Sequence, residues 1–72
     1  MHISGEKIRA ARARRGWTQR QVALAVDTRE RQVSLWEVGR AAPSAVYLLR
    51  LADALGVHPR ELATPDAPEV AR

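Results

Sequence analysis

The chain has 72 residues, no cysteine and a formal net charge of +4 at pH 7. This length allows one small domain, and the lack of cysteine excludes disulfide scaffolds, cysteine zinc sites and thiol nucleophiles. No apolar run approaches the roughly 18 residues of a membrane span and the N-terminus lacks a signal-peptide core, so we expect a cytoplasmic protein.

A first helix is predicted from Ser4 to about Arg15. Ser4 is a suitable N-cap, and Glu6 lies in the first turn, where the helix dipole favours an anion. Ile8 and Ala11 mark the inner face. Gly16 is expected to end the helix in the left-handed conformation. Ala11 is small for a core position, and either Trp17 or Trp36 could fill the space beside it.

Two short helices joined by a tight corner are predicted between Thr18 and Glu37. Thr18 and Gln21 have the spacing of a capping box, and Trp17 and Val22 that of a hydrophobic staple. Val22, Ala23 and Val26 then share one helical face. Asp27 and Thr28 interrupt this pattern with residues that favour turns and caps over helix interiors.

The second of these helices has two different faces. Val33 and Trp36 lie three residues apart on one face, which is expected to point to the core. Arg31 and Leu35, four residues apart, then point outward together with Ser34. A short helix that presents such residues is suited to contact a partner.

The rest of the chain is predicted to hold two more helices. Ser44 caps a fourth helix, whose apolar residues at helical spacing end at Gly56. These apolar residues are Leu48, Leu51, Ala52 and Leu55. Pro59 begins a short fifth helix, which contributes Leu62, together with Val57 before it, to the core. We therefore divide the chain into a folded domain at residues 4–63 and a flexible tail at residues 64–72, where proline and a lack of periodicity prevail.

The central stretch resembles the helix-turn-helix of the Cro and lambda-repressor-like (XRE) family. The resemblance runs without a gap from about Gly5 to Leu62. The matching residues are Thr18-Gln19, Ala23, Val33-Ser34, Trp36-Glu37, Gly39-Arg40 and Pro43-Ser44. It implies an all-α, lambda-repressor-like domain of five short helices.

Two residues depart from the family pattern. Asp27 stands where the family usually has glycine, although aspartate tolerates the left-handed conformation. Arg29 stands where a small polar residue is usual, so Thr28 is an alternative source of the helix cap.

The resemblance implies sequence-specific binding of double-stranded DNA, with the outer face of the second short helix in the major groove. Residues expected to contact bases are Glu30, Arg31, Ser34 and Leu35. Residues expected to contact phosphates are Thr18, Gln19, Arg29 and Arg40. Glu30 has an equally good alternative role in a helix-dipole contact or a salt bridge. The resemblance also implies a structural ion pair between Arg12 and Glu37. Family members often bind palindromic sites as dimers, for which the surface of the last two helices is the candidate.

The charge distribution agrees with a nucleic-acid partner. Residues 1–40 contain nine Lys or Arg and four Asp or Glu, whereas residues 41–72 contain three and four. The basic excess thus lies in the half that carries the predicted helix-turn-helix. A solvated basic surface would give the same composition, so charge alone does not decide between the two.

No group of residues predicts catalysis. His2 and His58 are far apart, no motif pairs either with a carboxylate or serine, and there is no glycine-rich phosphate loop. We expect a protein that is not an enzyme, with no cofactor, no metal site, no small-molecule ligand and no membrane contact. A transcriptional regulator is the first hypothesis. The alternative is a protein-binding module on the same fold, such as an antitoxin or a partner-recruiting subunit. RNA binding is less well supported because no aromatic stacking platform is evident.

Overall fold

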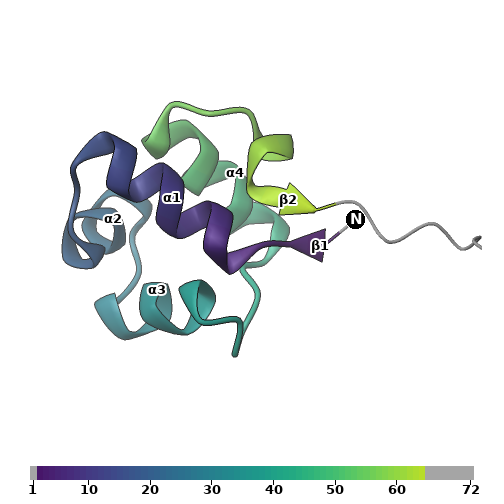
Figure 1. The fold of residues 1–72 in the computed structure, drawn as a ribbon. Helices are drawn as coiled ribbons and strands as arrows, with labels where there is room; N and C mark the ends of the chain where they lie inside the picture. Colours follow the sequence, from purple (N-terminus) through teal and green to yellow (C-terminus); the bar gives the residue numbers. More distant parts are fainter. Residues whose placement is uncertain (1, 65–72) are drawn as a thin grey trace, which may run out of the picture.

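The computed structural model describes residues 2–64, and within this range the chain folds into four α-helices, a short 3-10 helix and a two-stranded ladder. The elements in order are β1 (His2–Ile3), α1 (Gly5–Arg15), α2 (Gln19–Val26), α3 (Glu30–Glu37), α4 (Ala45–Leu55), η1 (Pro59–Leu62) and β2 (Ala63–Thr64). Figure 1 shows α1 lying across the other helices, with α3 along one side of the molecule and α4 with η1 toward the other. The predicted all-α class is confirmed.

The helices begin and end at the residues whose side chains and backbone favour those positions. Ser4, Thr18 and Ser44 each accept a hydrogen bond from the backbone N–H three residues later. The Thr18 cap is a complete capping box, because Gln21 also accepts from the Thr18 N–H at 2.7 Å. Gly16 and Gly56 end α1 and α4 in the left-handed conformation. These local signals were therefore predicted correctly.

The corner between α2 and α3 is formed by Asp27 in the left-handed conformation, with φ 65° and ψ 54°. The N–H of Thr28 donates to the Ala23 carbonyl at 2.9 Å and helps to close the end of α2. The alternative cap at Thr28 is wrong, because the N-cap of α3 is Arg29. The N–H groups of Gln32 and Val33 both donate to the Arg29 carbonyl, whereas the Arg29 side chain makes no cap hydrogen bond.

The predicted short fifth helix, beginning at Pro59, is present as the 3-10 helix η1. His58 caps it, since its Nδ1 accepts from the Arg60 N–H at 3.0 Å while its own N–H donates to Glu61 at 2.8 Å. The helix has only four residues before the chain turns extended at Ala63. So short a segment favours the tighter 3-10 turn.

A ladder that was not predicted joins the two ends of the domain. Strands β1 and β2 are antiparallel, with His2 opposite Thr64 and Ile3 opposite Ala63. The ammonium group of Lys7 donates to the Ala63 carbonyl at 2.9 Å. The folded domain therefore includes residues 2, 3 and 64 in addition to the predicted residues 4–63. Of the predicted tail, residues 65–72 lie outside the described residues.

The core lies between the helices and is almost entirely aliphatic. Leu51 of α4 and Leu62 of η1 are fully buried, as the helical spacing predicted. Of the two tryptophans, Trp36 is buried and Trp17 only partly so. The other buried hydrophobic residues are Ile8, Ala11, Val22, Ala23, Val26, Val33, Ala52, Leu55 and Ala63.

Helix α1 begins directly against the end of α3. A side chain at Gly5 would overlap the carbonyl oxygens of Trp36 and Glu37. Only glycine allows the two backbones to approach this closely. Gly5 thereby sets the position of α3 against α1.

Candidate nucleic-acid interface

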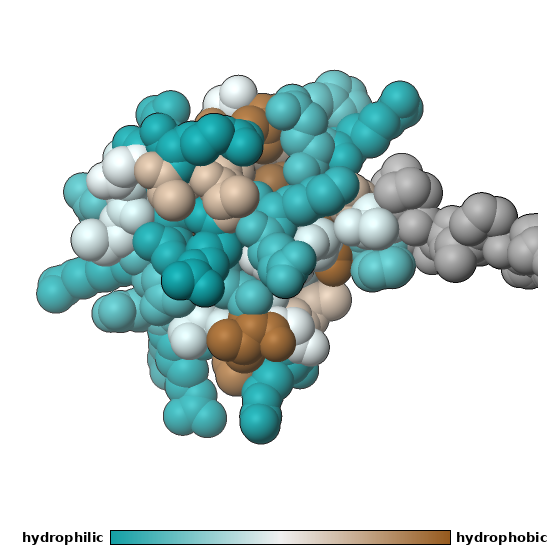
Figure 2. Space-filling model, in the orientation of Figure 1, coloured by the Kyte–Doolittle hydropathy of each residue, from teal (hydrophilic) through white to brown (hydrophobic). Residues whose placement is uncertain are grey.

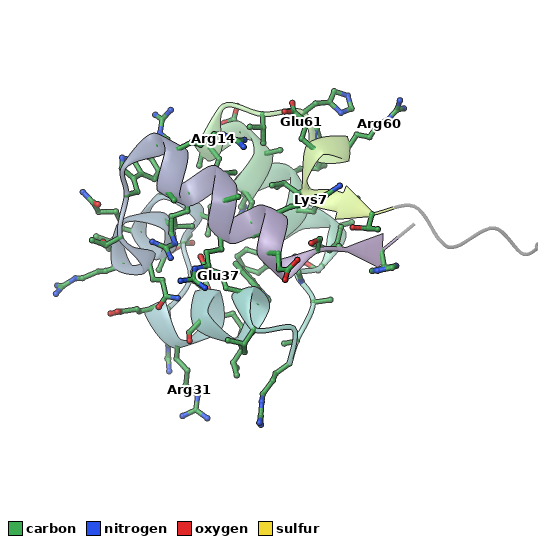
Figure 3. The ribbon with its side chains drawn as sticks, viewed as in Figure 1. Lys7, Arg14, Arg31, Glu37, Arg60 and Glu61 are labelled. Atoms are coloured by element: carbon green, nitrogen blue, oxygen red, sulfur yellow. The ribbon has the colours of Figure 1, made fainter. Side chains whose placement is uncertain are left out.

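The two faces of α3 differ as the sequence predicted. Val33 and Trp36 are buried, whereas Arg31 is exposed and Leu35 is half-buried. In Figure 3 the side chain of Arg31 extends from α3 away from the body of the protein. Ser34 is half-buried, and Glu30 is exposed in the first turn of α3. The outer face thus presents one guanidinium, one hydroxyl, one apolar side chain and, at its start, one carboxylate.

An open hollow adjoins this outer face. It lies between the α2–α3 corner, α3 and the first half of α4. The residues that line it are Asp27, Thr28, Arg29, Arg31, Gln32, Leu35 and Tyr47. The structure therefore brings Arg29, Arg31 and Leu35 of the predicted interface together at one depression.

Helix α4 holds the corner between α2 and α3 in place. The Tyr47 hydroxyl donates to the Asp27 carbonyl, and Arg50 Nη1 donates to the Val26 carbonyl, both at 3.2 Å. The Arg50 guanidinium also lies 5.4 Å from the centre of the Tyr47 ring, and the Tyr47 and Trp36 rings lie 5.4 Å apart. Sequence reasoning missed both residues, because nothing in their spacing indicates which distant carbonyls they reach.

A buried polar network ties α3 to α1 and α2. The Glu37 carboxylate accepts from Arg12 Nε at 2.6 Å, from Arg12 Nη2 at 3.0 Å and from Gln19 Nε2 at 3.0 Å. Arg12 Nη1 also donates to the Trp17 carbonyl at 2.9 Å. The Glu37 side chain is only 3% exposed and that of Arg12 is 17% exposed. Figure 3 shows Glu37 between α1 and α3. The structure contains the ion pair that the family resemblance implies, and it adds Gln19, which was not expected there.

The network favours the charged form of both partners. Burial on its own would raise the pKa of Glu37, but hydrogen bonds from Arg12 and Gln19, with the charges of Arg12 and Arg9, outweigh it. The pKa of Glu37 is therefore lowered below its ordinary value. The pKa of Arg12 is raised, chiefly by its hydrogen bond to Glu37.

The residues expected to contact phosphates lie at both ends of α3 and at the start of α2. Arg29 and Arg40 are exposed, immediately before α3 and three residues after it. The backbone N–H of Arg40 donates to the Leu35 carbonyl at 3.0 Å, which fixes the chain at this point. Thr18 and Gln19 lie at the start of α2, the former in the capping box and the latter bonded to Glu37. The first-turn N–H groups of a helix are available to an anion.

The described surface is mainly hydrophilic. Figure 2 shows one face that is largely teal, with a brown patch over the region of α3. The exposed large hydrophobic residues are Leu24, Val38, Val46 and Leu49. Within residues 2–64, no helix has the length and apolar character needed to cross a bilayer. The same residues contain no group of three His, Asp or Glu side chains placed to hold a metal ion.

Known proteins share both the sequence pattern and the fold. A family model described as Helix-turn-helix (HTH_3) matches residues 8–62. The restriction-modification controller protein C.AhdI from Aeromonas hydrophila is 34% identical, with a TM-score of 0.78, over 82% of this chain and 89% of that one. The P22 c2 repressor, solved in complex with a synthetic operator, is 30% identical, with a TM-score of 0.82, over 92% and 100% of the two chains.

A third solved structure is more distant in sequence. The hypothetical transcription factor NHTF from Neisseria is 28% identical, with a TM-score of 0.78, over 85% of this chain and 70% of that one. No curated protein sequence matches the chain.

Proposed function

The chain belongs to the helix-turn-helix family of Cro and lambda-repressor-like (XRE) proteins, and on this premise we propose that it binds double-stranded DNA sequence-specifically, as a small transcriptional regulator. The observation that carries the proposal is that α3 is amphipathic. Its inner face is buried in the core, and its outer face presents Arg31 and Leu35 between the exposed arginines Arg29 and Arg40. Such a helix can enter the major groove while α2 crosses the backbone.

The outer face supplies the base contacts. The Arg31 guanidinium can bind O6 and N7 of guanine in a bidentate manner, and Leu35 can contact a thymine methyl group. Ser34, one residue before Leu35, has a hydroxyl that can donate to or accept from a base. Glu30 can accept from the N4 amino group of cytosine. Guanine and cytosine are therefore the bases that the start of α3 is suited to read.

The flanking residues supply the phosphate contacts. Arg29 and Arg40 lie at either end of α3, where the strands of a duplex would pass. Thr18 and Gln19 stand at the start of α2, where backbone N–H groups and the helix dipole favour an anion. These contacts would hold the protein in register without reading sequence.

We further propose that two copies bind a palindromic site through α4. Val46 and Leu49, one helical turn apart, are 58% and 60% exposed, and Arg50 and Asp53 follow them with opposite charges. A face that combines apolar residues with both charges can pair with a second copy of itself across a two-fold axis. Sedimentation with and without a palindromic duplex tests this, and a 1:1 complex on such a site would refute it.

Selection of bound duplexes from a random pool at stated salt, followed by titration of the selected and a scrambled duplex, tests the function. We expect a selected motif, preferred at least tenfold, and an affinity that falls with salt. No duplex binding at low salt would refute DNA binding and favour the protein-binding alternative, an antitoxin or partner-recruiting subunit. We assign the chain no catalytic role and no cofactor.

A further inference from the structure

The side chain of Gln19 is held from within the protein, although it lies where DNA would pass. Its Nε2 donates to Glu37 Oε1 at 3.0 Å, across 18 positions of the sequence. Glu37 is the only charged residue that is buried within the described part of the chain. Its carboxylate is itself fixed by the two hydrogen bonds from Arg12. The end of α3 therefore holds the first residue of α2 in one position.

The chemistry of Glu37 also determines which end of the Gln19 amide it holds. An ionised carboxylate has acceptors only, so it can bind the nitrogen of the amide but not its oxygen. The amide nitrogen carries two N–H groups, and the bond to Glu37 uses one of them. The second N–H remains available for another acceptor. Rotation of the amide by 180° would place the Gln19 amide oxygen against a carboxylate oxygen of Glu37, and two acceptors repel each other.

We propose that Glu37 is a positioning residue for the phosphate contact of Gln19, and this inference rests on the proposed DNA binding. Glu37 directs the second N–H of the Gln19 amide, beside the free backbone N–H groups at the start of α2, toward a phosphate oxygen. Arg12 keeps the carboxylate ionised and in place, and Arg9 adds positive charge nearby. The negative charge of Glu37 is thereby compensated before DNA arrives, and its role is to orient a donor.

The test is a double-mutant cycle on DNA affinity. Glu37→Gln keeps the size of the side chain but carries both a donor and an acceptor, so the Gln19 amide is free to rotate. We expect Glu37→Gln to weaken binding to the selected duplex roughly three- to tenfold, the equivalent of one hydrogen bond. Combined with Gln19→Met, which cannot donate, it should cause no further loss. The affinities are measured at a temperature at which circular dichroism shows each variant folded.

A matched control separates positioning from stability. Leu51→Ala opens a cavity in the core and lowers the melting temperature, but it lies outside the network of Arg12, Gln19 and Glu37. We expect its folded form to bind DNA as the parent does. The inference would be overturned if Glu37→Gln lowered the affinity by the same factor in the parent and in Gln19→Met. It would also be overturned if folded Glu37→Gln bound DNA with the affinity of the parent.

Two further measurements cover a Glu37→Gln variant that fails to fold. In Gln19→Asn the ion pair is intact but the shorter amide cannot reach both Glu37 and a phosphate, so we expect it to bind like Gln19→Met. Parental affinity for Gln19→Asn would refute the positioning role. The side-chain amide resonances of Gln19 test the contact without DNA, since the proton bonded to the Glu37 carboxylate should lie downfield of its ordinary shift, and shifts equal to those of a solvent-exposed glutamine would contradict the contact. Failure of the parent to bind any duplex would instead refute the proposed function itself.

Discussion

Arg12 and Glu37 meet in a bidentate ion pair, in which Nε and Nη2 of the arginine contact the two carboxylate oxygens at 2.6 and 3.0 Å. The pair joins α1 to the last residue of α3. Removal of either side chain leaves the opposite charge of the other one uncompensated at a largely buried position. The position of α3 therefore depends on both side chains.

We expect Arg12→Ala and Glu37→Ala each to lower the free energy of unfolding by about 3 kcal/mol, the low end for a buried pair because Arg12 stays partly exposed. The double variant should lose clearly less than the sum of the two. Urea denaturation of the four proteins measures this. Additive losses would mean that the two side chains do not interact in solution.

Acid should destabilise the protein through Glu37. Because its pKa is lowered in the folded state, its contribution to stability is complete above its ordinary pKa of 4.5 and is lost as the pH falls through the lower folded value. Melting temperatures from pH 7 down to pH 2 should therefore decrease below about pH 4.5. The decrease should be smaller in Glu37→Gln, and an identical pH profile for both proteins would contradict this role.

Two leucines of α4 provide a matched test of the core. Leu51 is fully buried, whereas Leu49, two residues earlier on the same helix, is 60% exposed. Leu51→Ala should cost about 2–5 kcal/mol, because it leaves a cavity, and Leu49→Ala well under 1 kcal/mol. Thermal or urea unfolding distinguishes them, and similar losses for both would contradict the burial of Leu51.

Arg31 and Arg40 should affect DNA binding in different ways. Loss of a bidentate base contact in Arg31→Ala should cost about 1–3 kcal/mol on the selected duplex and relax the preference at one base pair. Arg40→Ala should weaken selected and scrambled duplexes alike and reduce the slope of log affinity against log salt by about one.

Arg14 supplies a control of the same charge for both variants. In Figure 3 it lies on the side of the molecule away from Arg31. Arg14→Ala should therefore leave both the affinity and the salt slope nearly unchanged. If Arg31→Ala lowers the affinity for selected and scrambled duplexes equally, α3 is not the element that reads sequence.

The features predicted correctly from the sequence are those that depend on near neighbours. The caps at Ser4, Thr18 and Ser44 act over three residues, and the left-handed end of α1 at Gly16 and the end of α4 at Gly56 depend on one residue each. The burial of Val33 and Trp36 opposite Arg31 follows from helical periodicity alone. For these features, the local preference of the chain and the final fold agree.

The features that were missed depend on pairs far apart in the sequence. His2 meets Thr64, Gln19 meets Glu37, and Tyr47 meets the Asp27 carbonyl only once the helices have packed. The 3-10 form of η1 likewise depends on where β2 begins. Periodicity gives the inner face of each helix, but it does not give the distant partner that a polar side chain reaches.

The ladder between β1 and β2 makes the domain suitable for head-to-tail cyclisation. Because His2 lies directly opposite Thr64, a linker of a few residues would join these two positions without moving a helix. Closing the backbone between these positions restricts the unfolded chain far more than the folded one, since His2 and Thr64 already lie together in the fold. Cyclisation would therefore stabilise the domain without changing α3 or any residue of the proposed interface.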